Sequence, residues 1–509
     1  MHASDAADQA SDAARAPIVE TRAIDYIPWT ERRGKVWYQG PFWFAGSFIL
    51  VTMAVGFTGP LAGLGFGWSA IAAVLGSAVG TFFMAFHANQ GPRLGIPQMI
   101  QSRAQFGTRG VIVPLLAALC VYIGFNAFNG PMATQGFQAV AGRRWPWFAT
   151  VMALQLVIAI VGYDLIHRVQ RWLTYVLIAS FAVLTVGTLI ALDAPRYFVM
   201  GPFHATAFFS QFVVSAGYQI GFAIYVSDYT RYLPPNTRLA PIVLWTYVGA
   251  NLSAFWLMPL GSLYAIALKN GATITSVQTA GNLFAPGLGS AVMIVSAVAL
   301  MTVMAVNTYG ATLVALTTLD CFRPIRSSRR TRIIGTLIVS IPTLALSLLL
   351  PEAYQESFNN FLTLMLYFLI PWSAINLVDY YWVRRGQYAV LEMFRSDGVY
   401  GRWAWRGLLS YAVGFCAMVP FFALPFFSGP AARALGGVDI SFIFGLLVSG
   451  LTYYGLARRM DLSRERTAQL ESIAALEPTH AASLHAPVVD AKVPEKLAPV
   501  PGVRGAYAD

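Results

Sequence analysis

Eight neutral amide side chains lie inside stretches of the chain that are otherwise almost entirely apolar. They are Asn126, Asn129, Gln135, Gln155, Gln211, Gln219, Asn251 and Asn307. An amide carries a donor and an acceptor together, so it can pair with the polar edge of a small molecule. In lipid an unpaired amide costs free energy, so these side chains should face a shared interior. Singly, most would tie helices together; as a set flanked by aromatic residues, they favour recognition of a flat, uncharged, hydrogen-bonding solute.

Charged residues are missing from the same stretches. No Asp, Glu, Lys or Arg lies deep in any of them, and a charge at the centre of a bilayer costs about 3 kcal/mol. A charged solute or a buried carboxylate relay is therefore poorly supported. The stretches also lack a metal-binding cluster of His or Glu, a Ser/His/Asp set on one side and a Walker phosphate loop. We expect no enzyme, no cofactor and no bound metal.

The apolar stretches themselves are long enough to cross a membrane. Of 509 residues, 57% are hydrophobic and 11% are charged, and a hydrocarbon core needs about 20 apolar residues per helix. Lipid forces each segment to satisfy its own backbone hydrogen bonds, which favours helices over open strands. The sequence predicts an all-α polytopic protein with twelve spans. They lie at 41–65, 68–89, 111–140, 146–163, 172–192, 207–227, 240–266, 289–314, 333–350, 357–378, 407–427 and 439–457.

The basic residues predict the orientation of these spans. Counted by side of the membrane, 26 Lys and Arg lie in one set of alternate gaps together with the flanks of the first and last spans. The opposite set of gaps holds five. Such an excess marks the cytoplasmic side, so both termini are expected in the cytoplasm of a multi-pass protein of the plasma or inner membrane. The net charge of +11 then reports topology and implies no nucleic-acid partner. Residues 1–39 are expected to be a disordered tail without a cleavable signal, and 463–509 a cytoplasmic tail with a short helix near 462–476.

Glycine and proline interrupt two of the spans. Span one contains Gly59 and Pro60 in a run that begins at Gly56, and span six contains Gly217 followed by Gly221. The two runs lie five spans apart and would enter the membrane with opposite polarity, a pattern typical of inverted repeats with broken helices around a central site. The alternative is that small residues only let helices approach closely.

A loop after span two carries a specific resemblance. It consists of Gly91, Pro92, Arg93, Leu94, Gly95, Ile96, Pro97, Gln98, Met99, Ser102, Arg103, Ala104, Gln105, Phe106, Gly107 and Gly110. This run resembles the corresponding loop of the nucleobase–cation symporters, the family of cytosine, purine, uracil, thiamine, allantoin and hydantoin permeases. The run from Asp228 to Tyr232 resembles the motif that closes span six in that family, and the lead from Val19 to Pro28 resembles its purine–cytosine branch. The similarity extends from about residue 19 to 460.

The resemblance implies a fold and a mechanism. Two inverted five-helix repeats, at 40–192 and 207–378, would be followed by two further helices at 407–457. Alternating access would operate around a midplane site between spans one, three, six, eight and ten. The implied function is import of a nucleobase or related heterocycle by cation- or proton-coupled symport. A carrier of another small solute, such as an amino acid, is the alternative, because one fold serves many functions.

The family's substrate-binding positions can be carried over residue by residue. Its span-three aromatic residue corresponds to Phe125, and the amide four residues later corresponds to Asn129, on the same helix face. The span-eight amide corresponds to Asn307. The span-six aromatic position holds Gln219 here, so this sequence departs from the pattern, and Tyr218 or Phe222 could supply the ring instead.

The coupling ion is less well matched. Sodium-coupled members carry two hydroxyl residues just before the span-eight amide, and here these are Ala305 and Val306. The remaining candidates for a cation site are the carbonyls of Ala54 and Phe57 and the hydroxyl of Thr302. The resemblance therefore leaves H⁺ or Na⁺ as the co-transported ion, with H⁺ slightly favoured.

Charged residues at the ends of the spans are assigned structural or gating roles. Asp228 and Arg231 are expected to form an ion pair or a tie at the end of span six. The arginines of the loop after span two are expected to meet lipid phosphates beside a short interfacial helix. The expected partners are a small-molecule substrate and the lipid bilayer, and the sequence leaves the oligomeric state open.

Overall fold

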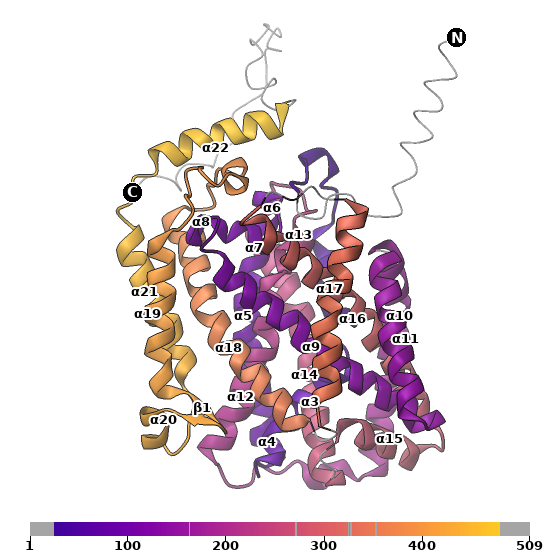
Figure 1. Cartoon of the computed structure of the whole chain (residues 1–509). Helices are drawn as coiled ribbons and strands as arrows, with labels where there is room; N and C mark the ends of the chain where they lie inside the picture. The colour runs from indigo at the N-terminus through magenta and orange to yellow at the C-terminus, as the bar shows by residue number, and fades with distance from the viewer. Residues whose placement is uncertain are drawn as a thin grey trace, which may run out of the picture.

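The chain folds as a bundle of helices, shown here as a computed structural model (Figure 1). The structure describes residues 25–478 except 162, 270–271, 324, 326–327 and 352–353. Side chains are not described for residues 161–171 and 329. In this part of the chain, eight helices are long and apolar enough to span a membrane, and a bent helix pair can form a ninth span. Two shorter apolar helices cover Arg144–Ile160 and Ser441–Ala457. The prediction of an all-α polytopic protein is confirmed, and twelve spans stay a prediction.

The elements follow one another along the chain with few long connections. Those up to residue 191 are α2 (Gln39–Ser47), α3 (Leu50–Val55), α4 (Thr58–Leu61), α5 (Phe66–Ala88), α6 (Gln90–Leu94), α7 (Gln98–Gln101), α8 (Arg103–Phe106), α9 (Ile112–Ala141), α10 (Arg144–Val161) and α11 (Tyr163–Ala191). Those from 205 to 378 are α12 (Ala205–Ile220), the 3₁₀ turn η4 (Gly221–Ile224), α13 (Val226–Thr230), α14 (Leu239–Leu268), α15 (Thr273–Phe284), α16 (Leu288–Asp320), α17 (Arg329–Leu349) and α18 (Gln355–Val378). The rest are the π-helical turn η5 (Asp379–Val383), η6 (Leu391–Phe394), α19 (Trp405–Met418), β1 (Ala423–Leu424), β2 (Phe427–Ser428), α20 (Pro430–Ala434), α21 (Ser441–Ala457) and α22 (Ser463–Leu476).

The packing of these helices has the pairing that two inverted repeats would produce. Helices α5 and α14, second in each half, pack together, and so do the third pair, α9 and α16, and the fourth pair, α10 and α17. Packing of α5 on α12 is matched by packing of α14 on α2 and α3. An axis in the membrane plane that relates the halves brings equivalent helices together in this way. The pairing supports the inverted repeat, which stays a prediction.

Span one is broken about two helical turns before the predicted run. Helices α2 and α3 meet at an angle of 67°, and Ile49 between them has extended backbone. Gly56 marks close packing, because a Cβ there would lie 1.9 Å from the carbonyl oxygen of Met258 on α14. Pro60 lies in the first turn of α4, where its missing N–H is no loss. The sharp bend therefore lies before the predicted run, and the run itself holds only the short interruption between the end of α3 at Val55 and the start of α4 at Thr58.

Span six is also broken at a different point. Helix α12 continues through 215–217 and ends at Ile220, followed by the turn η4 and by Tyr225, whose φ of −141° and ψ of 7° interrupt the helix. Gly217 serves close approach, since a Cβ there would lie 2.2 Å from the carbonyl oxygen of Leu362 on α18. The small residues that suggested a break are thus packing residues, and only Gly221 lies at the break itself.

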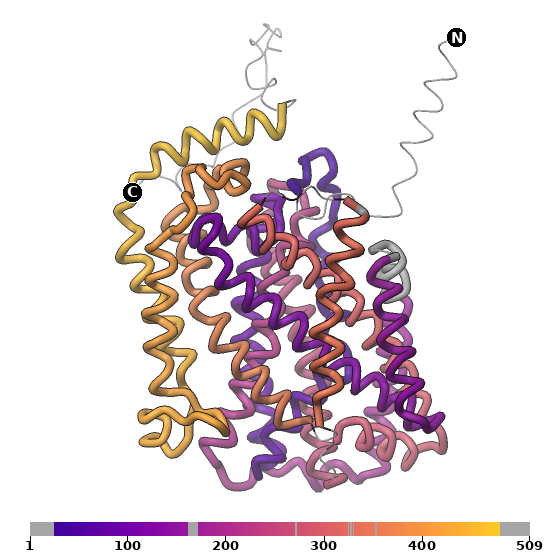
Figure 2. The backbone as a smooth tube through the Cα atoms, in the orientation of Figure 1, coloured from indigo at the N-terminus to yellow at the C-terminus, as the bar shows by residue number. Residues whose placement is uncertain are grey.

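The ends of the bundle hold structure that the sequence reading did not include. Helix α15 forms in the connection before α16, and the predicted span 407–427 ends at Met418, after which the chain turns into the β1–β2 hairpin. Residues 25–38, assigned to a disordered tail, contain two 3₁₀ turns, and Ile27 donates its N–H to the carbonyl of Gly95. The predicted helix near 462–476 is confirmed as α22, which lies across the end of the bundle where α6, α7 and α8 lie (Figures 1 and 2). Residues 1–24 and 479–509 of the predicted tails are outside the described residues.

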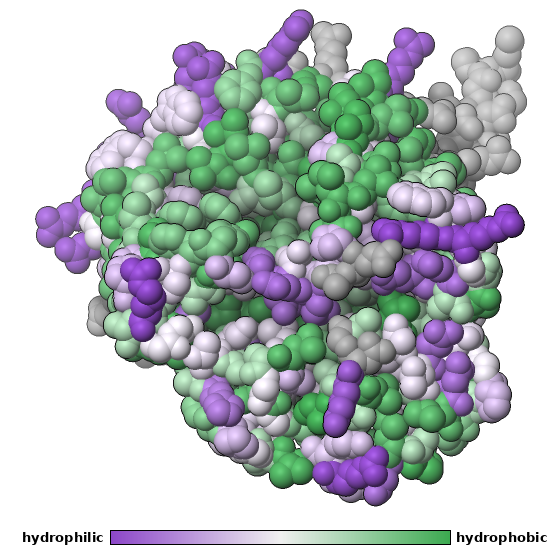
Figure 3. All heavy atoms as spheres, turned by 60° about the horizontal axis from the view of Figure 1, so that its bottom comes forward, coloured by the Kyte–Doolittle hydropathy of each residue, from purple (hydrophilic) through white to green (hydrophobic). Residues whose placement is uncertain are grey.

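The outer surface fits a lipid environment. Hydrophobic side chains cover a broad part of the face in Figure 3, and hydrophilic ones gather elsewhere on it. Large apolar side chains that are at least half exposed occur on the long helices, among them Leu349, Leu451 and Ile341. Exposed apolar surface of this extent is typical of contact with a membrane.

Candidate functional site

A small chamber lies where the breaks of spans one and six face α16. It has a volume of about 40 Å³, whereas ligand pockets typically enclose about 300–1,000 Å³. It is lined by Phe42, Trp43, Gly46, Phe222, Tyr225, Tyr229, Val303, Val306 and Asn307. None of these residues is charged, and five of the nine are aromatic. A chamber this small can hold a heteroaromatic base only after the surrounding helices move apart.

Aromatic rings form most of the chamber wall. On the α2 side, the Trp43 ring lies 5.5 Å from Tyr229, edge to face, and 6.1 Å from both Phe222 and Tyr225. Phe42 lies 4.6 Å from Tyr229. These contacts close the space between α2 and the broken part of span six. Rings in such an arrangement can also stack on a planar ligand once the helices separate.

Phe125 lies one ring behind this wall. Its ring contacts Tyr218 at 5.7 Å and Phe361 of α18 at 5.5 Å, both edge to face, and Tyr218 in turn contacts Phe222 at 5.5 Å. Gly221 allows the break of span six to approach, because a Cβ there would lie 3.3 Å from the Phe125 ring. The structure thus brings Phe125 and Tyr218 together beside the chamber. The Tyr218 hydroxyl pairs with that of Thr52, 2.7 Å away, and Thr52 also bonds the carbonyl of Ser47 at the break of span one.

Asn307 belongs to a chain of amides and hydroxyls that joins three helices. Its Nδ2 donates to Asn126 Oδ1 at 3.1 Å, and Asn126 Nδ2 donates to Thr308 Oγ1 and to the carbonyl of Met304, both at 2.9 Å. Thr308 donates to Gln155 of α10 at 2.9 Å. The donors of Asn307 are therefore oriented by protein, while its side chain lines the chamber and retains an acceptor oxygen.

Asn129 has an unsatisfied acceptor. It is only 1% exposed, and its Oδ1 has no hydrogen-bond partner among the described residues. A buried polar atom without a partner costs about 1–3 kcal/mol. It lies one helical turn beyond Phe125 on α9, so the pair shares a face as the spacing predicted. Asn129 does not line the chamber, but its unmet acceptor, on the same helix face as Phe125, is suited to receive a donor from a molecule bound beside α9.

Gln219 lies away from the chamber. Its Nε2 donates to Ser77 of α5 at 3.2 Å, and Ser77 donates to Asn251 of α14 at 2.9 Å. Gln219 Oε1 is buried without a partner among the described residues. The structure therefore groups Gln219 with a second polar cluster between α5, α12 and α14. Its role in substrate binding stays a prediction that the geometry does not favour.

The candidate cation residues already have protein partners. The carbonyl of Ala54 accepts a hydrogen bond from Gln355 Nε2 at 3.0 Å, and that of Phe57 accepts from the backbone N–H of Leu61. The hydroxyl of Thr302 donates to the carbonyl of Ala299 in its own helix. Because the main break of span one lies at Ser47–Ile49, the carbonyls predicted from a break at 56–60 are not those that the break exposes. A cation role for these residues stays a prediction.

The residues assigned to gating and structure tie the bundle at its ends. The backbone N–H of Gly59 donates to Gln211 Oε1 at 2.7 Å. Asp228 Oδ1 accepts from the N–H of Gln98 at the start of α7, which joins α13 to the loop that carries the resemblance. Arg231 donates to the Asp228 carbonyl and to that of Asp25. The expectation of a tie at the end of span six agrees with these contacts.

One arginine of the loop after span two is buried rather than lipid-facing. Arg103 is 2% exposed and pairs with Asp320 at 3.0 Å. It also donates to the carbonyl of Met393. The loop after span two and α16 enclose its guanidinium group, so the expectation that it meets lipid phosphates is wrong. Sequence reasoning could not detect this, because Asp320 is more than 200 residues away.

Sequence reasoning also missed part of the chamber wall. Phe42, Trp43, Tyr225 and Tyr229 were not assigned to the site, although Tyr225 and Tyr229 are four residues apart on either side of Asp228. Two aromatic residues at this spacing beside a break are a signal that could have identified them.

Comparison with known proteins agrees with this architecture. Residues 26–445 match the family described as permeases for cytosine/purines, uracil, thiamine and allantoin. The putative purine-cytosine permease YxlA of Bacillus subtilis is 36% identical over 444 residues, covering 86% of this chain and 96% of that protein. Purine-cytosine permease fcyB of Emericella nidulans is 25% identical, covering 86% and 87%.

Solved structures show the same fold. Mhp1, a nucleobase-cation-symport-1 family transporter, in a closed conformation with bromovinylhydantoin bound, superposes with a TM-score of 0.71 at 18% identity, covering 89% of this chain and all of that one. Inward-facing Mhp1 gives 0.70 at 17% identity, covering 90% and 98%. The chain therefore belongs to the family of permeases for cytosine/purines, uracil, thiamine and allantoin, whose members are transporters and not enzymes.

Proposed function

We propose that this permease imports a nucleobase or a related heterocycle by secondary active transport with alternating access. The observation that carries the proposal is the closed chamber itself: aromatic rings on one side, and the amides of α9 and α16 close to it on the other. Stacking on an aromatic ring contributes about 1–3 kcal/mol per base. Amide acceptors then select the pattern of donors on the edge of the base.

The chamber argues against the alternative of an amino acid carrier. A zwitterion brings a carboxylate and an ammonium group, and each needs a charged or dipolar partner when it leaves water. None of the residues that line the chamber is charged. The nearest arginine and carboxylate of span six, Arg231 and Asp228, line a separate cavity of about 20 Å³ at the end of the span. An uncharged solute fits the chamber better.

We further propose that protons rather than sodium ions drive uptake. Sodium is a hard cation that requires several oxygen ligands. Of the two positions before Asn307, Ala305 packs against Ala159, and Val306 lines the chamber with a hydrocarbon side chain. The Thr302 hydroxyl is used within its own helix. The two side-chain oxygens that positions 305 and 306 would give a sodium site are therefore missing.

Uptake of labelled cytosine by cells that express the permease tests both proposals. Unlabelled cytosine, adenine, uracil, allantoin and hydantoin should compete to different degrees, whereas amino acids should not. Replacing sodium by choline should leave uptake intact, and a protonophore should abolish it. Competition by amino acids alone would refute the proposed substrate, and uptake that needs sodium and survives the protonophore would refute the proposed coupling.

We propose that both termini lie in the cytoplasm. In a variant without its native cysteines, a cysteine at the exposed position Leu435, next to α20, should react with an impermeant thiol reagent added outside the cells. A cysteine at the exposed position Thr467 of α22 should react only after the cells are opened. The reverse pattern would show the opposite orientation.

A further inference from the structure

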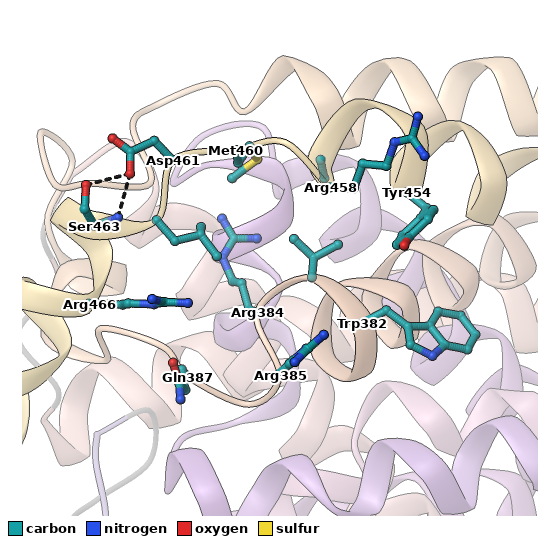
Figure 4. Close-up of a pocket in the computed structure, with 13 residues that line it drawn as sticks. Trp382, Arg384, Arg385, Gln387, Tyr454, Arg458, Met460, Asp461, Ser463 and Arg466 are labelled. Atoms are coloured by element: carbon teal, nitrogen blue, oxygen red, sulfur yellow. Dashed lines mark hydrogen bonds between the residues drawn. The ribbon is translucent and has the colours of Figure 1, made fainter. Parts of the chain in front are cut away.

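A groove of about 630 Å³, which shares no lining residue with the chamber, lies at the end of the bundle where α22 lies. Its walls come from three segments: the turn η5 and the residues after it, the end of α21, and the start of α22 (Figure 4). Four arginines line it: Arg384, Arg385, Arg458 and Arg466. In Figure 4, Arg466 extends from α22 toward Arg384 and Arg385, while Arg458 lies at the rim. Transport through the central chamber makes no use of this groove.

Most of this positive charge is uncompensated. Arg384 is the exception, because it pairs with Asp379 at 2.5 Å and with Glu465 at 2.8 Å. Arg385, Arg458 and Arg466 have no carboxylate within salt-bridge distance among the described residues. Asp461, the one acid in the lining, accepts two hydrogen bonds from Ser463 at the start of α22. Those bonds lower the pKa of the Asp461 carboxyl and hold it at the helix end.

The walls of the groove are fixed by buried contacts. Arg384 is 5% exposed, and the ion pairs that it forms connect the end of α18 with α22. Tyr453 of α21 donates to Asp379 at 2.8 Å, which adds the third wall to the same network. The next residue, Arg385, has a φ of +53°, a conformation that is rare for a residue with a side chain. Such strain persists where surrounding contacts enforce it, so the free guanidinium groups are presented on a preformed frame.

The groove opens at the level where a lipid headgroup would lie. Trp382 and Tyr454 line it and are 64% and 41% exposed. Trp and Tyr side chains concentrate at the polar boundary of a bilayer. One turn before Tyr454 on α21, Leu451 is 68% exposed, and Leu447 is 53% exposed, so the outer face of this helix is apolar up to the groove. An acyl chain could follow that face while the headgroup enters the groove.

We propose that this groove binds the phosphate-bearing headgroup of an anionic phospholipid. Arg385 and Arg466 contact the phosphate, and the rings of Trp382 and Tyr454 contact the glycerol region. Basic pockets beside membrane helices recognise anionic headgroups through charge and hydrogen bonds. Because three segments of the chain contribute, the bound lipid would connect η5, α21 and α22 and so stabilise the end of the bundle against unfolding.

The test uses purified full-length protein in neutral detergent. A short-chain phosphatidylglycerol is titrated while thermal unfolding is followed, with short-chain phosphatidylcholine and inorganic phosphate as separate arms. The double variant Arg385→Gln and Arg466→Gln is compared with the wild type. The matched control is Arg459→Gln and Arg464→Gln, which removes two exposed arginines next to the groove that do not line it.

Phosphatidylglycerol should raise the unfolding temperature of the wild type and of the control. The Arg385/Arg466 variant should need at least about tenfold more lipid for the same shift, which corresponds to the loss of one charge-assisted hydrogen bond. Its unfolding temperature without lipid should equal that of the wild type, since both side chains are exposed.

Three results would overturn the proposal. An equal loss in the control would mean that net charge alone attracts the lipid. An equal response to inorganic phosphate would mean a soluble anion site, and an equal response to phosphatidylcholine would mean that the acyl chains alone act.

Discussion

Replacing Asn129 by leucine separates a binding role from a structural one. The two side chains have similar size, so the change removes the amide without opening a cavity. Asn129 Oδ1 is buried and unsatisfied, at a cost of about 1–3 kcal/mol. Its removal should therefore leave the free energy of unfolding unchanged or raise it. A structural amide would give the opposite result.

The same substitution should weaken substrate binding. If the amide pairs with the base, the base loses its partner when it enters the closed site, again at about 1–3 kcal/mol. The half-saturation concentration for cytosine should then rise by roughly 5- to 150-fold. The measurements are uptake of labelled cytosine, corrected for the amount of permease in the membrane, and thermal unfolding in detergent.

Asn126→Leu is the matched control, one helical turn earlier on α9. Asn126 has three hydrogen bonds, to Met304, Thr308 and Asn307. Its loss should lower the free energy of unfolding by more than about 2 kcal/mol, because buried partners are left unpaired. Unchanged half-saturation in Asn129→Leu would refute the proposed contact. Destabilisation of Asn129→Leu as large as that of Asn126→Leu would show that Asn129 is a structural residue.

Three further outcomes follow from the same contacts. Phe125→Ala should raise the half-saturation concentration for cytosine by about tenfold or more through lost stacking. Phe125→Trp should retain transport. Equal transport by the wild type and both variants would indicate that Phe125 serves packing alone. Arg103→Gln should lower the free energy of unfolding by about 3–5 kcal/mol, because Asp320 loses its ion-pair partner. Adding Asp320→Asn to this variant should recover part of the lost stability in thermal unfolding. No recovery would show that loss of the ion pair is not the cause. Gly46 lines the chamber, and a Cβ there meets no atom within 4 Å, so Gly46→Ala should fold normally but lower uptake. Gly455→Ala, also in open space but on α21, should keep uptake unchanged; unchanged uptake in both would place the substrate elsewhere.

The sequence predicted the class of fold and the position of most long helices because these depend on local composition. A run of about 20 apolar residues is sufficient to indicate a membrane helix, and the edges of α9 and α14 agree with the predicted spans within two residues. The same reasoning failed for the predicted span 407–427. Its second half is as apolar as the first, but the hairpin that replaces it depends on distant contacts: Tyr367 of α18 and Asp439 both pair with the N–H of Ala423.

The locations of the breaks could not be read from glycine and proline alone. Gly56 and Gly217 face carbonyl oxygens of other helices, so their small size serves packing that only the assembled bundle reveals. The break at Ser47–Ile49 contains no glycine or proline. It is held instead by the hydroxyls of Thr52 and Tyr218, a contact between residues 166 positions apart. Contacts between residues distant in sequence decide both cases: close packing in the first and hydrogen bonds in the second.

For the site, resemblance and spacing pointed to Phe125, Asn129 and Asn307. Of these, Asn307 lines the chamber, Phe125 lies behind its wall, and contact of all three with a substrate stays a prediction. Resemblance and spacing could not show that Gln219 belongs to a different polar cluster, because its partner Ser77 lies on a helix distant in sequence. A residue on a buried helix can face either of two interiors, and span six borders both the chamber and the α5–α14 cluster.

The contacts around the chamber indicate where the molecule should move. Helices α3, α5, α12 and α14 pack at glycines with backbone in direct contact, as at Gly76 and Gly261, so they form one tightly joined group. Helices α9, α10 and α16 form another, joined by the Asn126 chain of hydrogen bonds. The two groups meet at the chamber mainly through rings, such as Tyr122 on Tyr225 and Phe125 on Tyr218. Ring contacts are weakly directional and can re-form in a new arrangement, whereas backbone contacts and amide networks cannot shift without loss. If the permease carries a base as proposed, the base would enter by separation of these two groups, and the rings that line that path would be the rings that hold it.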